Sequence, residues 1–290
     1  MNFEQTLQAK IDIIEQAIAQ YLYKNAPHES KLAQAVDWAM SGGGKRIRPV
    51  LTLAFAELCG KDAMQAIPFA LAVEFIHSYS LVHDDLPCMD NANVRRGKAS
   101  VHKQFGEATA LLAGDSLLTE AFAALCSNDS ISSSTTALAC KVLAAGSGAQ
   151  GGMISGQMTE MVLEGSEIGA QELQKICEGK TAALLETACK LGVFAGLNAD
   201  VTADIHSELL LAAQKYGRGI GLAFQMLDDI FDLDEDTAAG RVTFATLWGT
   251  EKTRKAANEL TREAKNALNV FSGDSSFLTE LADWLLTRKY

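Results

Sequence analysis

Proline and strand-forming patterns are scarce in this sequence. Only four of its 290 residues are proline, and none follows Pro87. Because proline breaks helix interiors, the long proline-free remainder, rich in Ala, Leu, Glu and Lys, favours long helices. Regular alternation of β-branched residues, which would indicate strands, is also missing. These absences predict an all-α fold. No linker, low-complexity segment or short repeat is recognisable, so we expect a single domain over residues 1–290.

A basic excess, long apolar runs and metal-type cysteine spacing are lacking too. The 25 Lys and Arg residues are outnumbered by 36 Asp and Glu residues, and the net charge of −11 argues against nucleic acid as a partner. No uncharged apolar run approaches the roughly 20 residues of a membrane span, and residues 1–20 have the charge spacing of an amphipathic helix rather than a signal peptide. The six cysteines show no CxxC spacing, which is typical of reduced thiols and predicts a cytoplasmic location.

Carboxylates, by contrast, are concentrated in the stretch His83–Asp90, which ends an apolar helical run. Acidic groups are unfavourable at a helix C-terminus, so three of them there need a reason beyond a solvated helix end. On one straight helix Asp84 and Asp90 would point about 120° apart. Pro87 gives the backbone a reason to deviate, which would let the carboxylates converge. His77 lies about two turns before Asp84, on nearly the same face of the helix. This position is compatible with a ligand-binding residue and with an ordinary half-buried histidine.

A second acidic cluster, Asp228–Asp232, occurs far along the chain. Asp228 and Asp232 are spaced i, i+4 and share a helix face, where like charges repel unless metal ions or cations neutralise them. A solvated acidic face is the alternative interpretation, but Phe224 and Ile230 make the surroundings apolar. We therefore expect the two acidic clusters to face each other across one cavity.

Basic residues accompany the first cluster. Gly42–Gly44 precede Lys45, Arg46 and Arg48 at the start of a predicted helix. Glycines permit close backbone approach to a ligand, and cations are unfavourable at a helix N-terminus unless an anion joins them. A phosphate site and a solvated helix start are both compatible with this pattern. Arg95 and Arg96 follow the carboxylates, and acid beside base suggests a phosphate site bridged by metal ions.

Together these stretches resemble the trans-isoprenyl diphosphate synthase family, and within it the short-chain bacterial farnesyl diphosphate synthases. The matches run in family order between about residues 42 and 249: a basic signature at Gly43–Pro49, a first aspartate-rich motif at His83–Asp90 with Arg95–Gly97, a Gly-Gly-Gln stretch at Gly151, Gly152 and Gln157, a Lys-Thr motif at Lys180–Thr181, and a second aspartate-rich motif at Phe224–Asp232.

The resemblance implies an α-helical bundle of about ten or more helices around a central cavity. It also implies a Mg²⁺-dependent prenyltransferase that condenses isopentenyl diphosphate with an allylic diphosphate, dimethylallyl or geranyl. Ionisation, condensation and proton loss would give farnesyl diphosphate and diphosphate, without an enzyme nucleophile. Homodimers are usual in the family, and residues 107–127 are a candidate surface.

The family's site residues carry over to matching positions of this sequence. Metal ligands would hold about three Mg²⁺ ions per site with substrate bound, and they are Asp84, Asp85, Asp90, Asp228, Asp229 and Asp232. Isopentenyl diphosphate would be held by Gly44, Lys45, Arg48, His77 and Arg96. The allylic diphosphate would be contacted by Arg95 and Lys180. Oxygen dipoles for the carbocation would come from Thr181 and Gln225. Product length would be limited by Tyr79, five positions before the first aspartate, with Ser80 beside it.

Two departures from the family pattern stand out. Asn91-Ala92-Asn93 replaces further aspartates, and the segment after Asp236 is shorter than in relatives by about ten residues, in a loop of the kind that often gates sites. Arg241 is the candidate replacement for one lysine of that loop. Geranylgeranyl or geranyl diphosphate synthesis, and a non-catalytic regulatory homologue, therefore remain as alternatives to farnesyl diphosphate synthesis.

Overall fold

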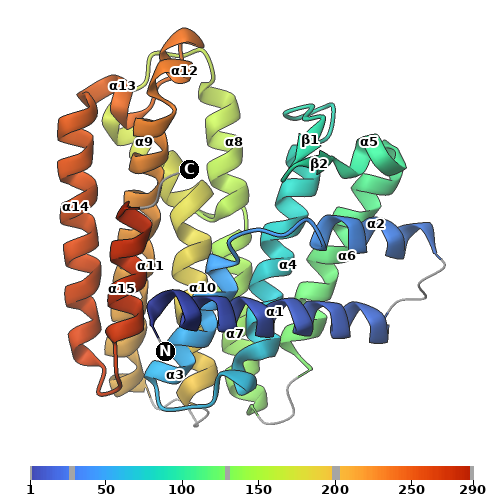
Figure 1. Ribbon diagram of the computed structural model, residues 1–290, viewed down its shortest axis with the longest axis vertical. Helices are drawn as coiled ribbons and strands as arrows, with labels where there is room; N and C mark the ends of the chain where they lie inside the picture. The colour runs from blue at the N-terminus through green and yellow to red at the C-terminus, as the bar shows by residue number, and fades with distance from the viewer. Residues whose placement is uncertain (1, 26–29, 128–130, 198–202, 288–290) are drawn as a thin grey trace.

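The computed structural model describes residues 2–25, 30–127, 131–197 and 203–287, with the side chains of 203–207 left aside. The predicted all-α fold is confirmed, and Figure 1 shows long helices packed side by side. The helices are α1 (Phe3–Asn25), α2 (Lys31–Met40), α3 (Ile47–Leu58), α4 (Ile67–Asp84), α5 (Val101–Phe105), α6 (Glu107–Leu125), α7 (Ser133–Ser147), α8 (Met153–Leu163), α9 (Ala170–Cys177), α10 (Ala183–Leu197), α11 (Ala203–Phe231), α12 (Leu233–Ala238), α13 (Phe244–Trp248), α14 (Thr250–Ala267) and α15 (Ser276–Thr287).

Helix α4 lies in the middle of the bundle. It is apolar around most of its circumference, as expected of a helix covered on all sides. Helices α1, α3, α6 and α10 pack against it. The helix starts with Pro68 in its first turn, where the missing N–H costs nothing, and it stops three residues before Pro87. Both prolines therefore help to fix where the first acidic cluster leaves the helix.

Helix α10 connects α4 with the second half of the molecule, because it contacts α3, α4 and α11. Helix α11 is amphipathic over its 29 residues and packs between α10 and α14. In Figure 1 the hairpin that follows α4 and the helix α12 that follows α11 lie at the same end of the bundle. The two acidic clusters are therefore carried to one end of the molecule.

Three short features differ from the sequence-based expectations. The sequence of residues 241–269 predicts a single closing helix, but Gly249 has a φ of +80° and separates α13 from α14. Residues 202–235 predict one long helix, but α11 ends at Phe231 and is followed by α12. A two-stranded hairpin, β1 (Val94–Arg95) with β2 (Lys98–Ala99), was not predicted. Its central residues Arg96 and Gly97 have φ values of +53° and +78°, as a two-residue type I′ turn requires.

Within the part of the chain that the structure describes, two helical stretches are long and apolar enough to cross a membrane by length and composition alone, Ala63–Asp84 and Glu107–Leu125. The first comprises the 3₁₀ turn Ala63–Ala66 and α4, and 67% of its most apolar window is buried inside the protein. The second is α6, with 39% of its window buried. The hydropathy of α4 is thus explained by its central place in the bundle, whereas the outer side of α6 remains uncovered within one chain.

Candidate functional site

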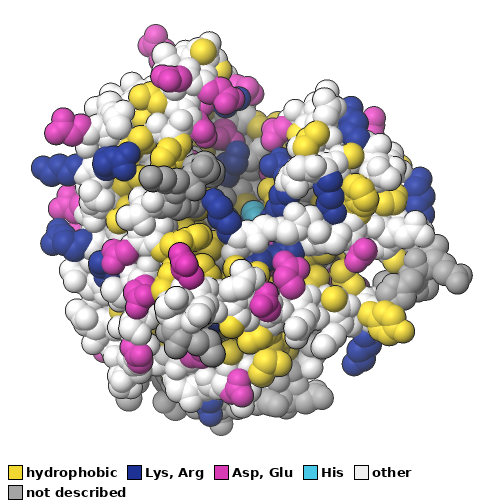
Figure 2. Space-filling view, viewed as in Figure 1, with side chains coloured by type: hydrophobic (Ala, Val, Ile, Leu, Met, Phe, Trp, Pro, Cys, Tyr) yellow, Lys and Arg dark blue, Asp and Glu magenta, His cyan; other side chains and the backbone are white. Residues whose placement is uncertain are grey.

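A cleft opens at the end of the bundle that carries the acidic clusters. Figure 2 shows basic and acidic side chains on both of its sides and a histidine at its floor. Beneath it lies a cavity of about 320 Å³. Its lining comes from the loop before α3, from α4, the hairpin turn, α10, α11 and α15, namely Gly44, Lys45, Arg46, Ile47, Arg48, Glu74, His77, Arg96, Thr181, Leu185, Ile220, Phe224 and Leu285. One cavity therefore joins the two halves of the molecule.

The residues predicted to bind isopentenyl diphosphate meet in this cavity. Gly44, Lys45 and Arg48 reach it from the loop and the first turn of α3. His77 reaches it from α4 and Arg96 from the hairpin turn, so five positions from three separate segments converge. The Lys45 ammonium lies 6.0 Å from the ring centroid of Phe224 on the opposite wall. Together with the N-terminus of α3, these cations make the cavity a suitable place for an anion.

His77 is held as a neutral acceptor inside this cationic group. Its Nε2 lies 3.4 Å from Arg48 Nη1. Since a guanidinium can only donate, Nε2 must be the unprotonated nitrogen and Nδ1 carries the hydrogen. Burial, followed by the charges of Arg48 and Arg96, holds the His77 pKa well below its usual value. His77 thus adds one N–H donor at the cavity without adding a charge.

Arg48 remains charged although it is enclosed. Burial lowers its pKa to about 10, with Glu74 opposing the effect and Arg96 adding to it. Its Nε makes no hydrogen bond to any part of the chain that the structure describes. Buried donors of this kind normally have a partner. An anionic oxygen in the cavity would supply one.

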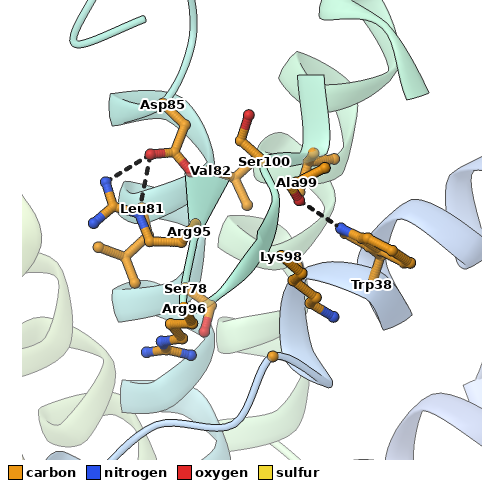
Figure 3. Close-up of a pocket in the computed structure, with 13 residues that line it drawn as sticks. Trp38, Ser78, Leu81, Val82, Asp85, Arg95, Arg96, Lys98, Ala99 and Ser100 are labelled. Carbon is orange, nitrogen blue, oxygen red and sulfur yellow. Dashed lines mark hydrogen bonds and ion pairs between the residues drawn. The ribbon is translucent and has the colours of Figure 1, made fainter. Parts of the chain in front are cut away.

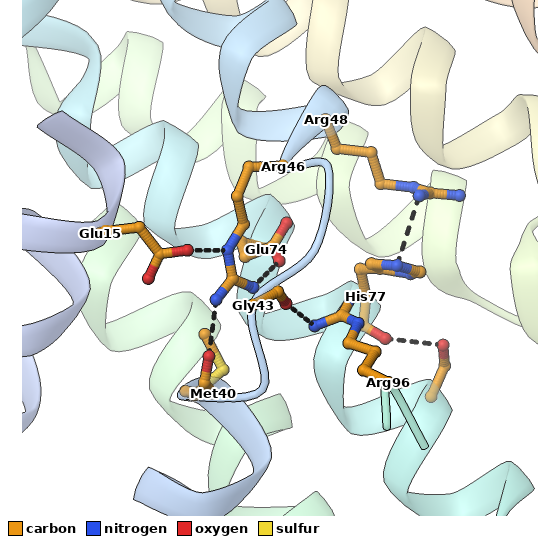
Figure 4. A network of polar contacts seen from close by, with 9 residues as sticks. Glu15, Met40, Gly43, Arg46, Arg48, Glu74, His77 and Arg96 are labelled. Atoms are coloured by element: carbon orange, nitrogen blue, oxygen red, sulfur yellow. Dashed lines mark hydrogen bonds and ion pairs between the residues drawn. The ribbon is translucent and has the colours of Figure 1, made fainter. Parts of the chain in front are cut away.

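Arg46, the third cation of the predicted phosphate site, also borders the cavity, but its guanidinium is fully buried and bound by groups of the protein itself. Its guanidinium donates to Glu74, to Glu15 Oε1 at 2.7 Å and to the Met40 carbonyl at 2.6 Å (Figure 4). Burial lowers its pKa, but Glu74 and Glu15 outweigh burial and raise it above the usual value. Arg46 adopts a left-handed φ of +46° at the start of α3. It is therefore a structural cation that fixes the loop carrying its two neighbours.

The first acidic cluster leaves α4 in a tight turn. The Asp90 N–H donates to the Asp84 carbonyl at 2.8 Å, so the two residues are brought together after the helix ends. The predicted deviation at Pro87 is confirmed. Asp84 is half-buried, and its pKa is raised to about 6 by burial, with Lys180 opposing and Asp90 adding to the effect. Because the charge of Lys180 acts on Asp84, the two side chains lie within electrostatic range of each other.

Asp85 has a different position from Asp84. Its side chain is only 3% exposed, and its Oδ1 accepts from Arg95 Nε at 3.0 Å and Nη2 at 2.6 Å (Figure 3). The hydrogen bond to Asp85 raises the Arg95 pKa above its usual value. These contacts favour a positioning role for Asp85 over the predicted metal-ligand role. They also aim Arg95 along the hairpin rather than into the cavity that Arg96 lines.

The charged and hydroxyl residues of Glu178–Ala182 interrupt an apolar helical pattern, which predicts a surface turn or kink, and the structure has a π-helical turn there between α9 and α10. Such turns often occur at functional sites. Lys180 projects from it and pairs with Glu160 on α8. Gly156 of α8 permits the close contact, because a Cβ at that position would lie 2.1 Å from the Lys180 backbone nitrogen. Close packing is therefore the role that the structure gives to this glycine of the Gly-rich stretch.

A chain of polar contacts connects the π-turn with the second acidic cluster. Thr181 Oγ1 donates to Gln225 Oε1 at 3.2 Å, and Gln225 Nε2 donates to Asp229 Oδ1 at 3.0 Å. Asp229 Oδ2 accepts from the Phe244 N–H at 2.8 Å. Burial raises the Asp229 pKa to about 6, although both hydrogen bonds oppose this. Asp229 thus ties α11 to α13, which favours a structural role over the predicted metal-ligand role, whereas Thr181 lines the cavity.

The remaining residues of this wall differ in exposure. Asp228 is half-buried in the last turn of α11, whereas Asp232 is exposed between α11 and α12. Arg241 lies in the turn before α13, with 62% of its side chain exposed and Nη1 3.3 Å from Asp236 Oδ1. Arg241 therefore pairs with Asp236 of the neighbouring helix α12 and is not part of the cavity lining. Of the second cluster, Asp228 is the carboxylate best placed to face a ligand.

Tyr79 and Ser80 occupy the α4 turn between His77 and Asp84. Tyr79 is 5% exposed, and its ring meets the His83 ring edge-on with centroids 5.7 Å apart. Burial, followed by Asp84, raises its pKa to about 12. Its hydroxyl has no hydrogen-bond partner among the described residues. Ser80 donates to the His77 carbonyl at 2.9 Å. The described contacts of the Tyr79 side chain are therefore packing contacts rather than hydrogen bonds.

The carboxylates fit a shared rather than a closed metal site. Among the described parts of the chain, no group of three or more His, Cys, Asp or Glu side chains is close enough together to hold an ion by itself. Mg²⁺ commonly takes one or two carboxylates together with substrate phosphates. A half-buried Asp84 with a raised pKa beside Asp90 is a place where a divalent cation would relieve carboxylate repulsion. Asp84, Asp90 and Asp228 are the residues suited to this.

Sequence reasoning missed Glu74, Glu160, Trp38 and Lys98. Glu74 was detectable, because a single acid inside the apolar run of residues 70–76 indicates a buried cationic partner. Glu160 is exposed and Lys98 is half-buried. Neither charge lies inside an apolar run, so nothing in the neighbouring sequence indicates a buried partner. Their roles follow only from their partners in space.

Comparison with known proteins agrees with this arrangement. The sequence profile described as "Polyprenyl synthetase" matches residues 29–246. "Geranylgeranyl pyrophosphate synthase 11, chloroplastic" of Arabidopsis thaliana is 40% identical over 274 residues, covering 89% of this chain and 74% of that protein. An apo FPP/GFPP synthase structure from Zymomonas mobilis has a TM-score of 0.86 at 33% identity, covering 97% of this chain and 99% of that one. A geranyltransferase from Legionella pneumophila has a TM-score of 0.87 at 32% identity, covering 99% and 98%.

Proposed function

The chain belongs to the polyprenyl synthetase family and is a prenyltransferase, and from this premise we propose that it condenses isopentenyl diphosphate with an allylic diphosphate to give mainly farnesyl diphosphate. The observation that carries the proposal is the cavity in which Lys45, Arg48 and Arg96 converge with His77, a residue of α4 that lies about two turns before Asp84. A diphosphate bound by these cations leaves its hydrocarbon tail directed into an otherwise apolar bundle.

Isopentenyl diphosphate keeps its diphosphate throughout the reaction. Lys45, Arg48 and Arg96 bind this group by charge, and Nδ1–H of neutral His77 adds a directed donor. The partner substrate loses its diphosphate, so the other end of the site must favour charge separation. Lys180 provides a cation there, once the incoming diphosphate competes with Glu160 for it. Mg²⁺, when bound by Asp84, Asp90 and Asp228, supplies Lewis-acid neutralisation of the departing diphosphate.

The allylic cation requires stabilisation without capture. Thr181 Oγ1 and Gln225 Oε1 are neutral oxygens, and Thr181 lines the cavity. Their dipoles lower the energy of nearby positive charge, while neither is a strong nucleophile. Gln225 is oriented by Asp229, because its side-chain amide Nε2 donates a hydrogen bond to Asp229 Oδ1. The alkene of isopentenyl diphosphate then forms the new carbon–carbon bond, and the proton that is lost passes to the released diphosphate.

Product length is the open choice among related enzymes, since the relatives' names include geranylgeranyl pyrophosphate and FPP/GFPP synthases. The proposal of farnesyl diphosphate rests on Tyr79, whose large buried ring occupies the α4 turn before the aspartates. We expect Tyr79→Ala to make the C20 product the majority, because truncation of a buried aromatic side chain leaves a cavity. Product analysis after incubation with isopentenyl diphosphate, dimethylallyl or geranyl diphosphate and Mg²⁺ measures this.

Tyr79→Phe is the matched control for this experiment. Because the Tyr79 hydroxyl has no partner among the described residues, the phenylalanine variant should keep the C15 product. A mainly C15 product from Tyr79→Ala, or a mainly C20 product from the natural chain, would refute the proposal that Tyr79 limits product length. Absence of product with every primer would instead favour the non-catalytic homologue.

A homodimer formed through the outer face of α6 is part of the same proposal. Leu111 and Leu112 are 47% and 56% exposed there, which is unusual for adjacent leucines on an otherwise apolar helix. We expect sedimentation to give twice the mass of the 31.0 kDa chain, and Leu112→Lys to shift the protein to monomer. Leu211, 51% exposed on α11, is the matched control. A natural chain that sediments as a monomer would refute the dimer.

A further inference from the structure

We propose that Trp38 and Lys98 are positioning residues that lock the loop Gly42–Gly44 to the β1–β2 hairpin, so that Lys45 and Arg96 meet one diphosphate. The inference rests on the proposed function of this cavity and adds two residues outside it. The loop and the hairpin are far apart in the sequence, yet each supplies cations to the same site. Their relative position therefore needs a connection of its own.

Lys98, on strand β2, forms the first part of this connection. Its ammonium lies 4.4 Å from the Trp38 ring centroid, close enough for a cation–π interaction. The same Nζ donates to Ser41 Oγ at 3.2 Å. The side chain also passes closely over the loop, since a Cβ on Gly42 would stand 3.2 Å from Lys98 Cε. One side chain thus touches the end of α2 and the first glycine of the loop.

Trp38 forms the second part. From α2, its Nε1 donates to the Ala99 carbonyl of β2 at 2.9 Å (Figure 3). Its ring meets Phe105 edge-on with centroids 6.0 Å apart. The indole is therefore fixed from two directions and offers a rigid surface for the Lys98 ammonium. Helix α2 and the hairpin are joined by these contacts on the side away from the substrate cavity.

The tip of the hairpin meets the tip of the loop at Arg96. Its Nη1 donates to the Gly43 carbonyl at 2.6 Å (Figure 4). Gly44 has a φ of +134°, which residues with a Cβ rarely adopt, and a Cβ there would lie 2.9 Å from the Arg96 guanidinium carbon, so glycine lets the backbone lie directly against Arg96. Displacement of the hairpin at Lys98 would move Arg96 relative to Lys45, because the same two segments carry both cations.

Trp38 and Lys98 do not touch the substrate in this arrangement. They line a separate cavity of about 30 Å³ between α2, α4 and the hairpin. That volume suits one or two water molecules and is too small for a diphosphate. Neither residue lines the 320 Å³ cavity. Their effect on binding must therefore pass through the loop and through Arg96.

The effect has a kinetic signature. The diphosphate of isopentenyl diphosphate carries the same charge before and after bond formation, so contacts to it contribute equally to the ground state and the transition state. Loss of such uniform binding raises KM and leaves kcat unchanged. A defect in folding would instead lower kcat and the amount of active enzyme. The KM-against-kcat split therefore separates positioning from simple stability.

The test compares Lys98→Met, Trp38→Phe and Lys103→Met with the natural chain. Lys98→Met keeps the aliphatic stem and removes the charge, and Trp38→Phe removes the donor to Ala99. For each, we expect the KM for isopentenyl diphosphate to rise about tenfold, while kcat and the KM for geranyl diphosphate change less than about twofold. Lys103→Met, at an exposed lysine on α5, should change none of these values.

A double-mutant cycle with Ser41→Ala tests whether Lys98 acts through its hydrogen bond to Ser41. Ser41→Ala alone should raise the same KM, and in the Lys98→Met background it should add nothing, since its partner is already absent. An unchanged KM for isopentenyl diphosphate in Lys98→Met, or equal changes for both substrates, would overturn the proposal while leaving the proposed function in place. A natural chain without turnover would instead contradict the proposed function. In that case calorimetric titration with inorganic diphosphate tests the positioning role by itself. Equal affinity for diphosphate in Lys98→Met and the natural chain would overturn that role.

Discussion

Replacement of Asp84 by asparagine is expected to lower kcat by about a thousandfold or more. Asparagine has nearly the same shape as aspartate but no charge, so it cannot neutralise a divalent cation beside Asp90. Steady-state assays with isopentenyl and geranyl diphosphate at saturating Mg²⁺ measure the loss. Asp62→Asn is the matched control, because Asp62 caps the 3₁₀ turn at the opposite end of α4 and asparagine caps equally well. Turnover of Asp84→Asn near that of the natural chain would refute the metal assignment.

The stability of the Asp84→Asn variant tests whether its loss of activity is caused by unfolding. Burial raises the Asp84 pKa from 3.8 to about 6. The folded protein therefore holds this proton more tightly than the unfolded chain does. The resulting stabilisation is complete below about pH 4 and is lost as the pH rises through about 6. At pH 8 the free energy of unfolding of Asp84→Asn should thus be about 1 kcal/mol larger than that of the metal-free natural chain. This figure is reduced from the full pKa effect because Asp84 is partly exposed to solvent. At pH 5 the advantage should be smaller.

Thermal denaturation at the two pH values measures this difference. A second set of curves with Mg²⁺ and inorganic diphosphate adds a readout that does not depend on turnover. The ligands should raise the Tm of the natural chain and have less effect on Asp84→Asn, since stabilisation follows affinity for the folded state. Equal Tm shifts in both proteins would count against metal binding at Asp84.

Glu74→Ala is expected to cost about 3–5 kcal/mol of folding free energy, the usual cost of leaving a buried charge without its partner. The side chains of Arg46 and Glu74 are 0% and 2% exposed, and the Arg46 guanidinium also supports the Met40 carbonyl. For a chain of this size the Tm should fall by about 10 °C. Thermal or urea denaturation measures the change.

Two further variants test the cause of this loss. Glu15→Ala removes the other carboxylate of Arg46, but the Glu15 side chain is 38% exposed, so about 1 kcal/mol is expected. Arg46→Met combined with Glu74→Leu removes both charges and should recover most of the stability. If the double variant is as unstable as Glu74→Ala, lost packing rather than an unpaired cation explains the result.

Much of the fold could be predicted from local sequence. The absence of proline after Pro87 and of strand-type alternation predicts an all-α fold, and helices Glu107–Leu125 and Ser133–Ser147 lie within a few residues of the apolar helical stretches 107–127 and 132–147 that the sequence indicates. The break at Gly249 was missed although a glycine after Trp248 is a signal for a helix end. The hairpin was missed because two-residue strands have no period to detect, but Arg96-Gly97 carried the signal of its turn.

The candidate site shows the limit of the same reasoning. Asp84 and Asp85 are adjacent in sequence, yet Asp84 is half-buried beside Asp90, whereas Asp85 is buried and bound by Arg95. Arg46 and Arg48 belong to one motif and both border the cavity, yet the Arg46 guanidinium is bound by Glu15, Glu74 and Met40, whereas Arg48 Nε has no partner among the described residues. Residue type and spacing cannot separate such neighbours, because their environments differ only through partners elsewhere in the chain.

The sequence by itself determined the helical class, the family and which charged clusters matter, because these depend on residue type and on near neighbours along the chain. The tertiary structure decided which member of each cluster turns toward the ligand. Glu74 and Glu15 direct Arg46 inward, Phe244 and Gln225 engage Asp229, and Trp38 and Lys98 join the loop to the hairpin. Charges buried in a packed interior must be paired, and the packing of distant helices determines which partners are within reach.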